Sequence, residues 1–346
     1  MRLPDCIYSG AWTGGHCQGI ALDTQGKYIY YSFTTMLVKT DLDGNLIGTV
    51  GGLLGHLGCI DFCDGDGRLY GSLEYKHDAI GQGILKRLGS GAQPEEGFYI
   101  AVFDADRIDR AGMDACRDGV MKTVYLKEVV RDYFWRGTVN GRPAEHKWGC
   151  SGIDGTTFGP VPGSADRKEY LFVAYGIYGD NGRPDNDHQV LLCYDTADWD
   201  RYATVLDQGA MHRNGPEKPD RKYFVYTGNT EWGVQNLEYD AWSGNYLMAV
   251  YPGRKPGFAN LPLYVIDGSA APVRRPLRGS DPPEEGEMLT LLSSPLGGDT
   301  PGFAFAHGST GLYSLGDGRF FVSHHGTCAQ GHDTYVRLYG YRDLIG

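Results

Sequence analysis

A repeated pattern constrains the fold of this chain more than any other feature of its sequence. Five segments each begin with a short apolar strand, turn at a glycine-containing hairpin and continue into a second strand rich in aromatic and β-branched residues. They begin at Gly19, Cys59, Gly152, Asn236 and Gly311, and a third apolar run follows each of them. One such meander cannot bury both of its faces, whereas copies stacked around an axis cover one another. The repeat therefore predicts an all-β fold, a five-bladed β-propeller.

The two ends of the chain predict how the ring closes. The last repeat lacks a fourth strand, and residues 4–10 precede the first repeat without a partner of their own. We expect the N-terminal strand to pair beside the last blade, which removes two exposed sheet edges. The interval 104–146 is long enough for a helix or an extra strand pair, and a β-sandwich or a sixth blade is the alternative. The prediction is a single domain, 1–346, with blades at roughly 17–52, 57–135, 150–228, 234–293 and 309–346 plus 4–10.

Charge and cysteine usage indicate which partners to expect. The net charge is −11 and the basic residues are scattered, so we expect no nucleic acid and no membrane surface as a partner. The opening residues contain no apolar core of a signal peptide, which predicts a cytoplasmic protein, or a secreted one if a leader has been removed. The eight cysteines follow no pairing pattern and are expected as free thiols. The oligomeric state stays open.

The repeat also predicts where chemically active side chains gather. The connection entering each first strand and the loop leaving each second strand lie at the same end of a propeller, around the mouth of its central channel. Imidazole is the commonest metal ligand, and His16 and Gln18 point to one side of an extended segment, about 6.6 Å apart. We expect a divalent metal, a transition metal rather than calcium. Its predicted ligands are His16, Gln18, His56, His307 and His324.

Other residues at this end are candidates for catalysis and for substrate binding. Glu74, His325 and Tyr175 are predicted to be catalytic, because they can move protons at the mouth. Aromatic rings beside Asp, Asn and Arg are typical of carbohydrate sites. The predicted substrate-binding residues are Trp148, Trp232, Gln235, Tyr251, Arg183 and Arg254. In the competing interpretation, the histidines and tryptophans pack between blades and bond to the backbone.

The openings of the repeats resemble those of two families. The segments HCQGI, WGCSGIDG and EWGVQNLEYD are similar to the blade openings of plant-type glutaminyl cyclases, which are five-bladed propellers with polar residues at one channel mouth. This resemblance implies an acyltransferase. The grouping of histidines with Gln18 is similar in kind to the metal site of propeller-fold oligogalacturonate lyases, which implies a His-rich metal centre.

These observations lead to one main hypothesis and its alternatives. The main hypothesis is a metal-dependent enzyme, a lyase or a hydrolase, that acts at the channel mouth on a small polar substrate, a carbohydrate above all. The alternatives are a non-catalytic propeller that binds a glycan or peptide, a glutaminyl cyclase-like acyltransferase, and a ring in which a metal is purely structural. Fold alone does not decide among them.

Overall fold

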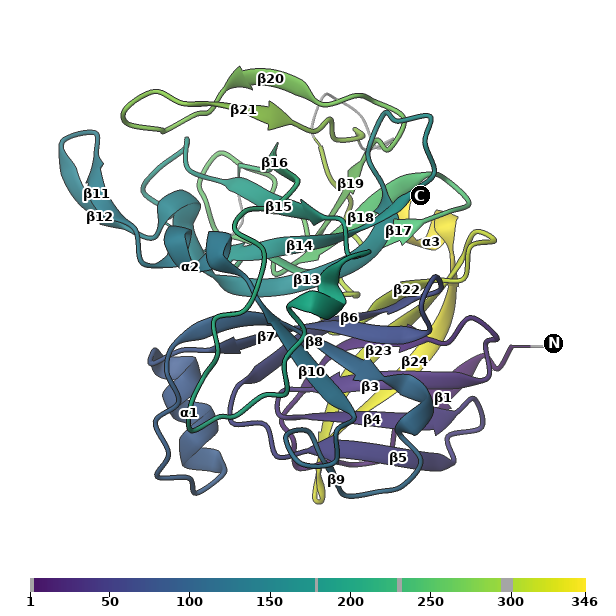
Figure 1. Ribbon diagram of the computed structural model, residues 1–346. Coiled ribbons are helices and arrows are strands. Elements are labelled where there is room, and N and C mark those ends of the chain that lie inside the picture. The colour runs from purple at the N-terminus through teal and green to yellow at the C-terminus, as the bar shows by residue number, and fades with distance from the viewer. Residues whose placement is uncertain (1–2, 178–179, 229–231, 294–300) are drawn as a thin grey trace.

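Five β-sheets are arranged around a central axis in the computed structural model, which describes residues 3–177, 180–228, 232–293 and 301–346 (Figure 1). The first strands of the five sheets are β2, β6, β13, β17 and β22. Each of these strands contacts the corresponding strand of both neighbouring sheets, and β22 contacts β2, so the contacts form a closed circle. The predicted five-bladed β-propeller is therefore confirmed.

The blades differ in the number of strands that they contain. The first blade contains β2 (Cys17–Leu22), β3 (Tyr28–Phe33), β4 (Met36–Asp41), β5 (Leu46–Gly51) and β9 (Met113–Asp114). The second contains β6 (His56–Cys63), β7 (Arg68–Tyr75), β8 (Gly97–Asp104) and β10 (Met121–Tyr125). The third contains β13 (Cys150–Pro160), β14 (Glu169–Ile177), β15 (His188–Tyr194), β16 (Arg221–Tyr226), β21 (Glu285–Met288) and β20 (Val273–Pro276). The fourth contains β17 (Val234–Asp240), β18 (Asn245–Val250) and β19 (Leu263–Ile266).

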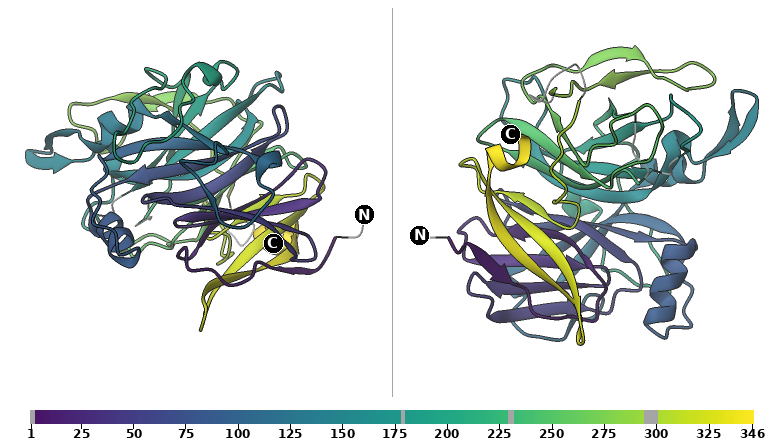
Figure 2. Two further views of the ribbon diagram at one scale, coloured as in Figure 1. Left: turned by 60° about the horizontal axis from the view of Figure 1, so that its bottom comes forward. Right: turned by 180° about the vertical axis from the view of Figure 1, so that it is seen from behind.

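The fifth blade joins the two ends of the chain. It contains β22 (Leu312–Ser314), β23 (Arg319–Cys328), β24 (Gly331–Gly340) and the N-terminal strand β1 (Cys6–Tyr8). β1 pairs antiparallel with β24, with Ile7 opposite Val336, and Ile7 is buried. The N-terminal segment lies beside the last strands when the molecule is seen from behind (Figure 2). Closure of the last blade by the N-terminal strand, as predicted from the missing fourth strand, is confirmed.

The apolar core is divided into clusters that lie between blades. Ile60 and Leu69 of the second blade pack with Tyr30 and Leu37 of the first. Comparable clusters join the second blade to the third, the third to the fourth, the fourth to the fifth and the fifth to the first. Each sheet therefore buries both faces against its neighbours, which is the physical reason that a repeated three- or four-stranded unit is stable only as a closed ring.

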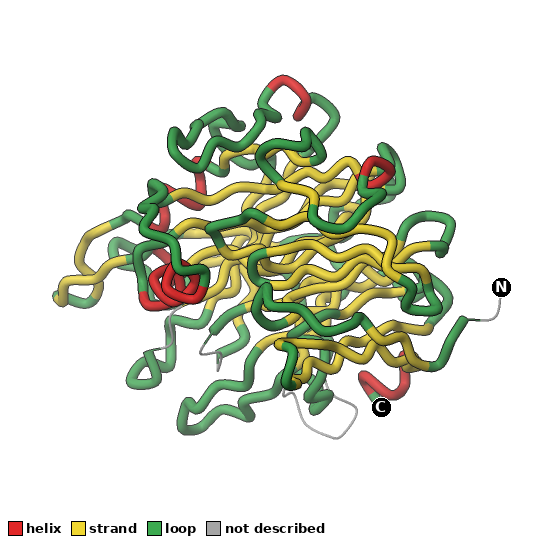
Figure 3. The backbone as a smooth tube through the Cα atoms, turned by 90° about the horizontal axis from the view of Figure 1, so that it is seen from below, coloured by secondary structure: helices red, strands yellow, loops and turns green. Residues whose placement is uncertain are grey.

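Helices and two extra hairpins lie outside the ring. The helices are α1 (Ala79–Arg87), α2 (Lys127–Tyr133) and α3 (Tyr341–Ile345), with short 3-10 turns at Ala105–Arg107, Lys147–Gly149 and Trp199–Arg201. The strands β11 (Arg136–Val139) and β12 (Arg142–Glu145) form a separate hairpin, so the interval 104–146 holds both a helix and an extra strand pair. Figure 3 shows these helices at the edge of the molecule. Within the described residues, no helix is long and apolar enough to cross a membrane.

Candidate functional site

A group of buried polar side chains lies where the second, third and fourth blades meet at one end of the channel. His56 begins β6, Glu74 lies opposite it in register on β7, Asp154 belongs to β13 and Gln235 to β17. Lys76 and Asp78 follow β7 directly. We call these six residues the mouth cluster. β6, β13 and β17 each have an irregular register near this end, and bulges of this kind redirect side chains beside functional sites.

The centre of the mouth cluster is an ion pair sealed from solvent. The Lys76 ammonium lies 2.6 Å from Glu74 Oε1, and the two side chains are only 5% and 4% exposed. Glu74 Oε2 accepts a hydrogen bond from the backbone N–H of Ile153 at 3.0 Å. Gly152 makes this approach possible, because a Cβ atom there would stand 2.0 Å from Glu74 Oε2. Both oxygens of Glu74 are therefore occupied by donors.

Lys76 is held by two further oxygen atoms. Its ammonium donates to the backbone carbonyl of Ser151 at 2.9 Å and lies 3.3 Å from Asp78 Oδ2. Asp78 also caps α1, because its side chain accepts from the backbone N–H of Gly81 at 2.9 Å. The ammonium thus connects the loop that follows β7 to the start of β13.

Asp154 and His56 differ from this pair in having unused hydrogen-bonding capacity. His56 Nδ1 lies 3.7 Å from Asp154 Oδ1 and 3.7 Å from Glu74 Oε1. Both His56 Nδ1 and Asp154 Oδ1 are buried atoms without a hydrogen-bond partner, which is uncommon in folded proteins. Asp154 Oδ2 accepts from the Gln235 amide at 3.2 Å, and 17% of the Asp154 side chain is exposed. Two unpartnered polar atoms therefore face each other at the edge of the channel.

Burial sets the protonation states of these groups. Burial raises the pKa of Asp154 well above its usual range, and the nearby charge of Glu74 raises it further. Burial also raises the pKa of Glu74, but Lys76 and the Ile153 N–H oppose that change. The pKa of His56 falls to about 3, first because of burial and then because of the Lys76 charge. At neutral pH His56 is therefore neutral, so its two 3.7 Å contacts are not ion pairs. Asp154 accepts fewer hydrogen bonds than Glu74, so fewer hydrogen bonds oppose the rise of its pKa.

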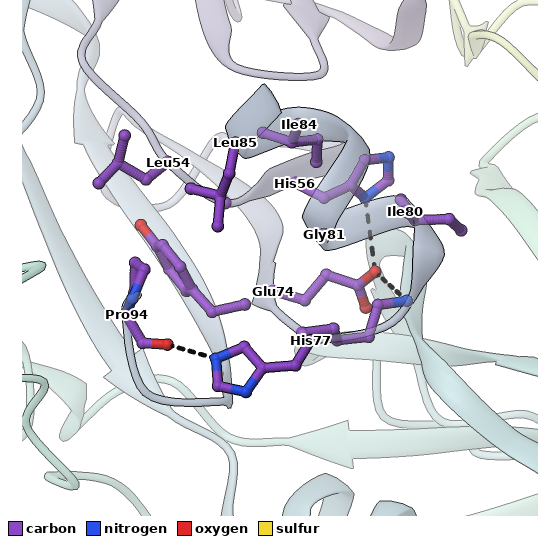
Figure 4. Close-up of a pocket in the computed structure, with 12 residues that line it drawn as sticks. Leu54, His56, Glu74, His77, Ile80, Gly81, Ile84, Leu85 and Pro94 are labelled. Atoms are coloured by element: carbon purple, nitrogen blue, oxygen red, sulfur yellow. Dashed lines mark hydrogen bonds and ion pairs between the residues drawn. The ribbon is translucent and has the colours of Figure 1, made fainter. Parts of the chain in front are cut away.

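A narrow pocket leads to this cluster from the side of α1. Ile80, Ile84 and Leu85 of α1 line it together with Leu54, and His56 and Glu74 lie at its inner end. Figure 4 shows His56 and Glu74 pointing toward each other, whereas His77 turns away. The His77 ring is bonded to the backbone carbonyl of Pro94 at 2.9 Å. The walls near the cluster are thus largely apolar, which keeps the local dielectric low.

The predicted metal ligands fall into three separate groups. The Gln18 amide nitrogen lies 3.0 Å from His16 Nε2, so the expected proximity of His16 and Gln18 is present. His56 belongs to the mouth cluster. The rings of His307 and His324 are 4.3 Å apart, and Tyr339 Oη lies 2.9 Å from His324 Nε2.

Strand geometry explains why His324 does not join His16. Successive residues on a strand point to opposite faces, so His324 and His325 of β23 cannot face the same neighbour. His325 is the one near His16, with ring centroids 5.5 Å apart, and His332 lies 5.3 Å beyond it. In the described part of the chain, no three His, Cys, Asp or Glu side chains are arranged to hold a metal ion. In the mouth cluster, the positive charge beside the carboxylates of Glu74 and Asp78 is the ammonium of Lys76.

The other predicted residues are also dispersed. Tyr175 is fully buried in the apolar cluster between the second and third blades, and its hydroxyl donates to Asp132 of α2 at 3.1 Å. Tyr251 and Gln235 lie near Asp154, since the charge of Asp154 raises the pKa of Tyr251 after burial does. Trp232 is 51% exposed, and Arg254 is exposed on the loop after β18. Trp148 and Arg183 instead line a cleft outside the ring.

Asp154, Lys76 and Asp78 are the members of the cluster that the predicted site lacks. Asp154 stands in the segment GIDG, within a strand that lines the channel. An ionisable residue on a strand enclosed by neighbours is itself a sign of function, because burial of a carboxyl needs compensation. Lys76 follows Glu74 at the second position, the spacing that places His16 and Gln18 on one side of an extended segment, so the sequence contained a signal for this contact as well.

No protein-family model matches this chain, and no curated protein matches it. Among solved structures, the PQQ domain of pyranose dehydrogenase from Coprinopsis cinerea, in its holo form, is 12% identical. The match covers 92% of this chain and 81% of that one, with a TM-score of 0.35. The β-propeller domain of Cps50 (Swd1) from Myceliophteria thermophila is 8% identical, with 96% and 99% covered and a TM-score of 0.36. Likenesses this weak bear on no question of activity, so the site has to be interpreted from its own residues.

Proposed function

We propose that the mouth cluster is the active site of an enzyme that transfers protons to and from a small polar substrate. The observation that supports this most is the pair of unpartnered buried atoms, Asp154 Oδ1 and His56 Nδ1, 3.7 Å apart beside a sealed ion pair. A purely structural cluster would satisfy both atoms, because an unpaired buried polar group costs about 1–3 kcal/mol.

Asp154 is the proposed general acid. Its raised pKa favours the protonated carboxyl, which is the state that a leaving oxygen requires. When the substrate C–O bond breaks, the Asp154 proton passes to that oxygen and a carboxylate remains. Its new negative charge raises the proton affinity of His56, so Nδ1 can accept the proton released by water or by a substrate carbon. The proton then returns from His56 to Asp154.

Glu74 and Lys76 are positioning residues in this scheme. Both are almost fully buried and have all of their strong partners within the protein, so neither is free to touch a substrate. The Glu74 charge raises the pKa of Asp154, and Lys76 lowers the pKa of Glu74 against the larger effect of burial. Glu74, predicted from the sequence as catalytic, is therefore proposed to act through Asp154.

Carbohydrate is the proposed substrate class, and lyase or hydrolase the proposed reaction. Both chemistries need an acid for a leaving oxygen, and a sugar offers hydroxyls to Gln235 and a C–H surface to Tyr251. The test is a screen of aryl glycosides and uronate disaccharides with the wild type, Asp154→Asn and a control, Asp61→Asn, at the opposite end of the channel. We expect turnover that falls about a hundredfold or more in Asp154→Asn and persists in Asp61→Asn. Undiminished turnover in Asp154→Asn, or none by the wild type on any compound, would contradict the proposal.

The divalent metal expected from the sequence remains a separate prediction with its own test. Metal analysis of untreated protein should find a near-stoichiometric ion, and changing His16 and His307 to Ala should remove it. Protein that carries no such ion would end that prediction without affecting the role proposed for Asp154.

A further inference from the structure

A second cavity lies outside the ring, beside the third blade. It has a volume of about 290 Å³ and lies between the β11–β12 hairpin, the turn at Lys147–Gly149 and the β20–β21 hairpin. Figure 1 shows the two hairpins projecting from the same side of this blade. Their tips are tied together, since the backbone N–H of Asn140 donates to Asp281 Oδ2 at 2.9 Å. We call this cavity the hairpin cleft.

The inner wall of the hairpin cleft contains Trp148 in an unfavourable backbone conformation. Its φ is +58°, and that of His146, two residues earlier, is +60°. Left-handed backbone is rare for bulky side chains, and where the surroundings enforce it the residue is often part of a binding site. The Trp148 ring packs edge-on against Phe224 at 5.0 Å, which fixes the orientation of the indole. Trp135 lines the same cleft and adds a second indole.

Most charged groups of the hairpin cleft already have partners. The Lys147 ammonium lies 3.0 Å from Glu284, Arg183 lies 3.0 Å from Asp185, and Glu145 pairs with Arg136 at 3.2 Å. Asp281 accepts from the neighbouring hairpin, as described above. These pairs leave little charge available for a ligand.

Among the described residues, Asp180 has no ion-pair partner, and its side chain accepts from the backbone N–H of Gly182 at 3.0 Å. The cation of the cleft without a carboxylate partner is Arg278. It is exposed, its guanidinium stands 4.5 Å from the centre of the Tyr226 ring, and no carboxylate of the described residues lies within ion-pair distance of it. Its backbone carbonyl is bonded to His188 Nε2 at 3.2 Å, and His188 is 2% exposed with an unpartnered Nδ1. Contact with the ring restricts the guanidinium, so it offers a planar, pre-oriented pair of N–H donors to an anion.

We propose that the hairpin cleft binds a sugar that carries a carboxylate. Arg278 would bind the carboxylate through two parallel hydrogen bonds, while the indoles of Trp148 and Trp135 cover the C–H surface of the ring. Asn186 also lines the cleft, and its amide N–H groups can donate to the hydroxyls, because Lys255 engages only its Oδ1. This site is independent of the function proposed for the mouth cluster, because the two sites share no residue.

The test compares two disaccharides that differ only in their carboxylates, a β-1,4-linked diglucuronate and cellobiose. Binding is followed by tryptophan fluorescence with the wild type, Arg278→Gln and a matched control, Arg274→Gln. Arg274 lies on the same hairpin and pairs with Glu285 outside the cleft. We expect the diglucuronate to bind at least tenfold more tightly than cellobiose, Arg278→Gln to abolish that difference, and Arg274→Gln to keep it.

Other outcomes would overturn the proposal. Equal binding of the two disaccharides, no binding of the diglucuronate, or unchanged binding by Arg278→Gln would each do so. Inorganic phosphate that competes as strongly as the diglucuronate would show a site for anions rather than for sugars. Trp148→Phe, checked for folding by its melting temperature, should weaken both disaccharides. Asp154→Asn should bind the diglucuronate as the wild type does, so that failure of this site and failure of the mouth cluster are distinguishable.

Discussion

The two ends of the central channel both bury carboxyl groups, but these carboxyls differ in their counter-ions and in their hydrogen bonds. At the opposite end a cavity of about 300 Å³ is lined by Asp61, Glu238 and further acids, and we call it the acidic mouth. Burial raises the pKa of Asp61 to about 7 and that of Glu238 well above its usual range. The acidic mouth holds no buried lysine, whereas the mouth cluster has Lys76 at its centre.

The two ends differ more in how many hydrogen bonds their carboxyl oxygens accept than in their charge. Asp61 Oδ2 accepts from the Phe158 N–H at 2.7 Å and from the Thr157 hydroxyl at 3.1 Å, and Oδ1 accepts from the Phe62 N–H. Glu238 accepts from the Ser314 N–H at 2.6 Å. In contrast, Asp154 Oδ1 accepts from no donor. Carboxyls at the acidic mouth join neighbouring blades, and the carboxyl of Asp154 is available for chemistry.

The largest expected effect comes from removing the cation of the mouth cluster. Lys76→Met leaves Glu74 buried without its counter-ion, and we expect it to lower the free energy of unfolding by about 3–5 kcal/mol. Urea denaturation at pH 7 measures this. Adding Glu74→Gln should restore a large part of the loss, because the unpaired charge is then gone. A loss below about 1 kcal/mol would mean that the ion pair is not sealed from solvent.

Two matched amide substitutions at the two ends should have smaller and unequal effects on stability. Asp61→Asn places an amide NH₂ where backbone donors converge and should cost about 1–3 kcal/mol of stability. Asp154→Asn can turn its oxygen toward Gln235 and leave its NH₂ near His56, so we expect a loss below about 1 kcal/mol. Denaturation curves of both variants test the comparison, and a larger loss in Asp154→Asn would reverse it.

Asp61 at the acidic mouth and the histidines near the other end should affect the pH dependence of stability in opposite directions. Asp61 has a raised pKa in the folded state, so its contribution favours folding below about pH 4 and is lost as the pH rises toward 7. His56 and His16 have pKa values lowered to about 3 and 4, mainly by burial, so their contribution is present above about pH 6.5 and is lost as the pH falls toward 4.

The measurement is the unfolding free energy between pH 4.5 and 6.5, where each group changes the slope by at most about 1.4 kcal/mol per pH unit. Asp61→Asn should make stability rise more steeply with pH than in the wild type, and His56→Gln should make it rise less steeply. Parallel curves for the three proteins would show that neither residue titrates differently in the folded and unfolded states.

The sequence predicts the ring because the ring is a local property repeated five times. Strand, hairpin and strand can be recognised in each copy, and the missing last strand identifies β1 as its partner. The short-range proximity of His16 and Gln18 also follows from strand spacing. These predictions need no knowledge of how side chains from different blades are oriented.

The site depends on that orientation, and the sequence does not provide it. Whether His324 or His325 faces His16 depends on which face of β23 each residue occupies. The hydrogen bond of Tyr175 to Asp132 depends on where α2 packs. The contacts of Lys76 with Ser151 and Asp78 depend on the path of the chain after β7 and on the neighbouring blade. The hairpin cleft is formed by two hairpins. One is the hairpin at 136–145. The other, β20–β21, follows the fourth blade in the sequence but joins the third blade, because β21 pairs in parallel with β16. Contacts of this kind are set by tertiary packing.

The protonation state of Asp154 tests the account most directly. Carboxyl ¹³C NMR of protein labelled at aspartate side chains, assigned with Asp154→Asn and Asp61→Asn, follows each group from pH 4 to 8. We predict that the Asp154 carboxyl is still protonated at pH 7, and that Lys76→Met changes its titration because the cluster is coupled. An Asp154 signal that titrates near pH 4, like that of an exposed aspartate, would contradict the assignment of the mouth cluster as an acid–base site.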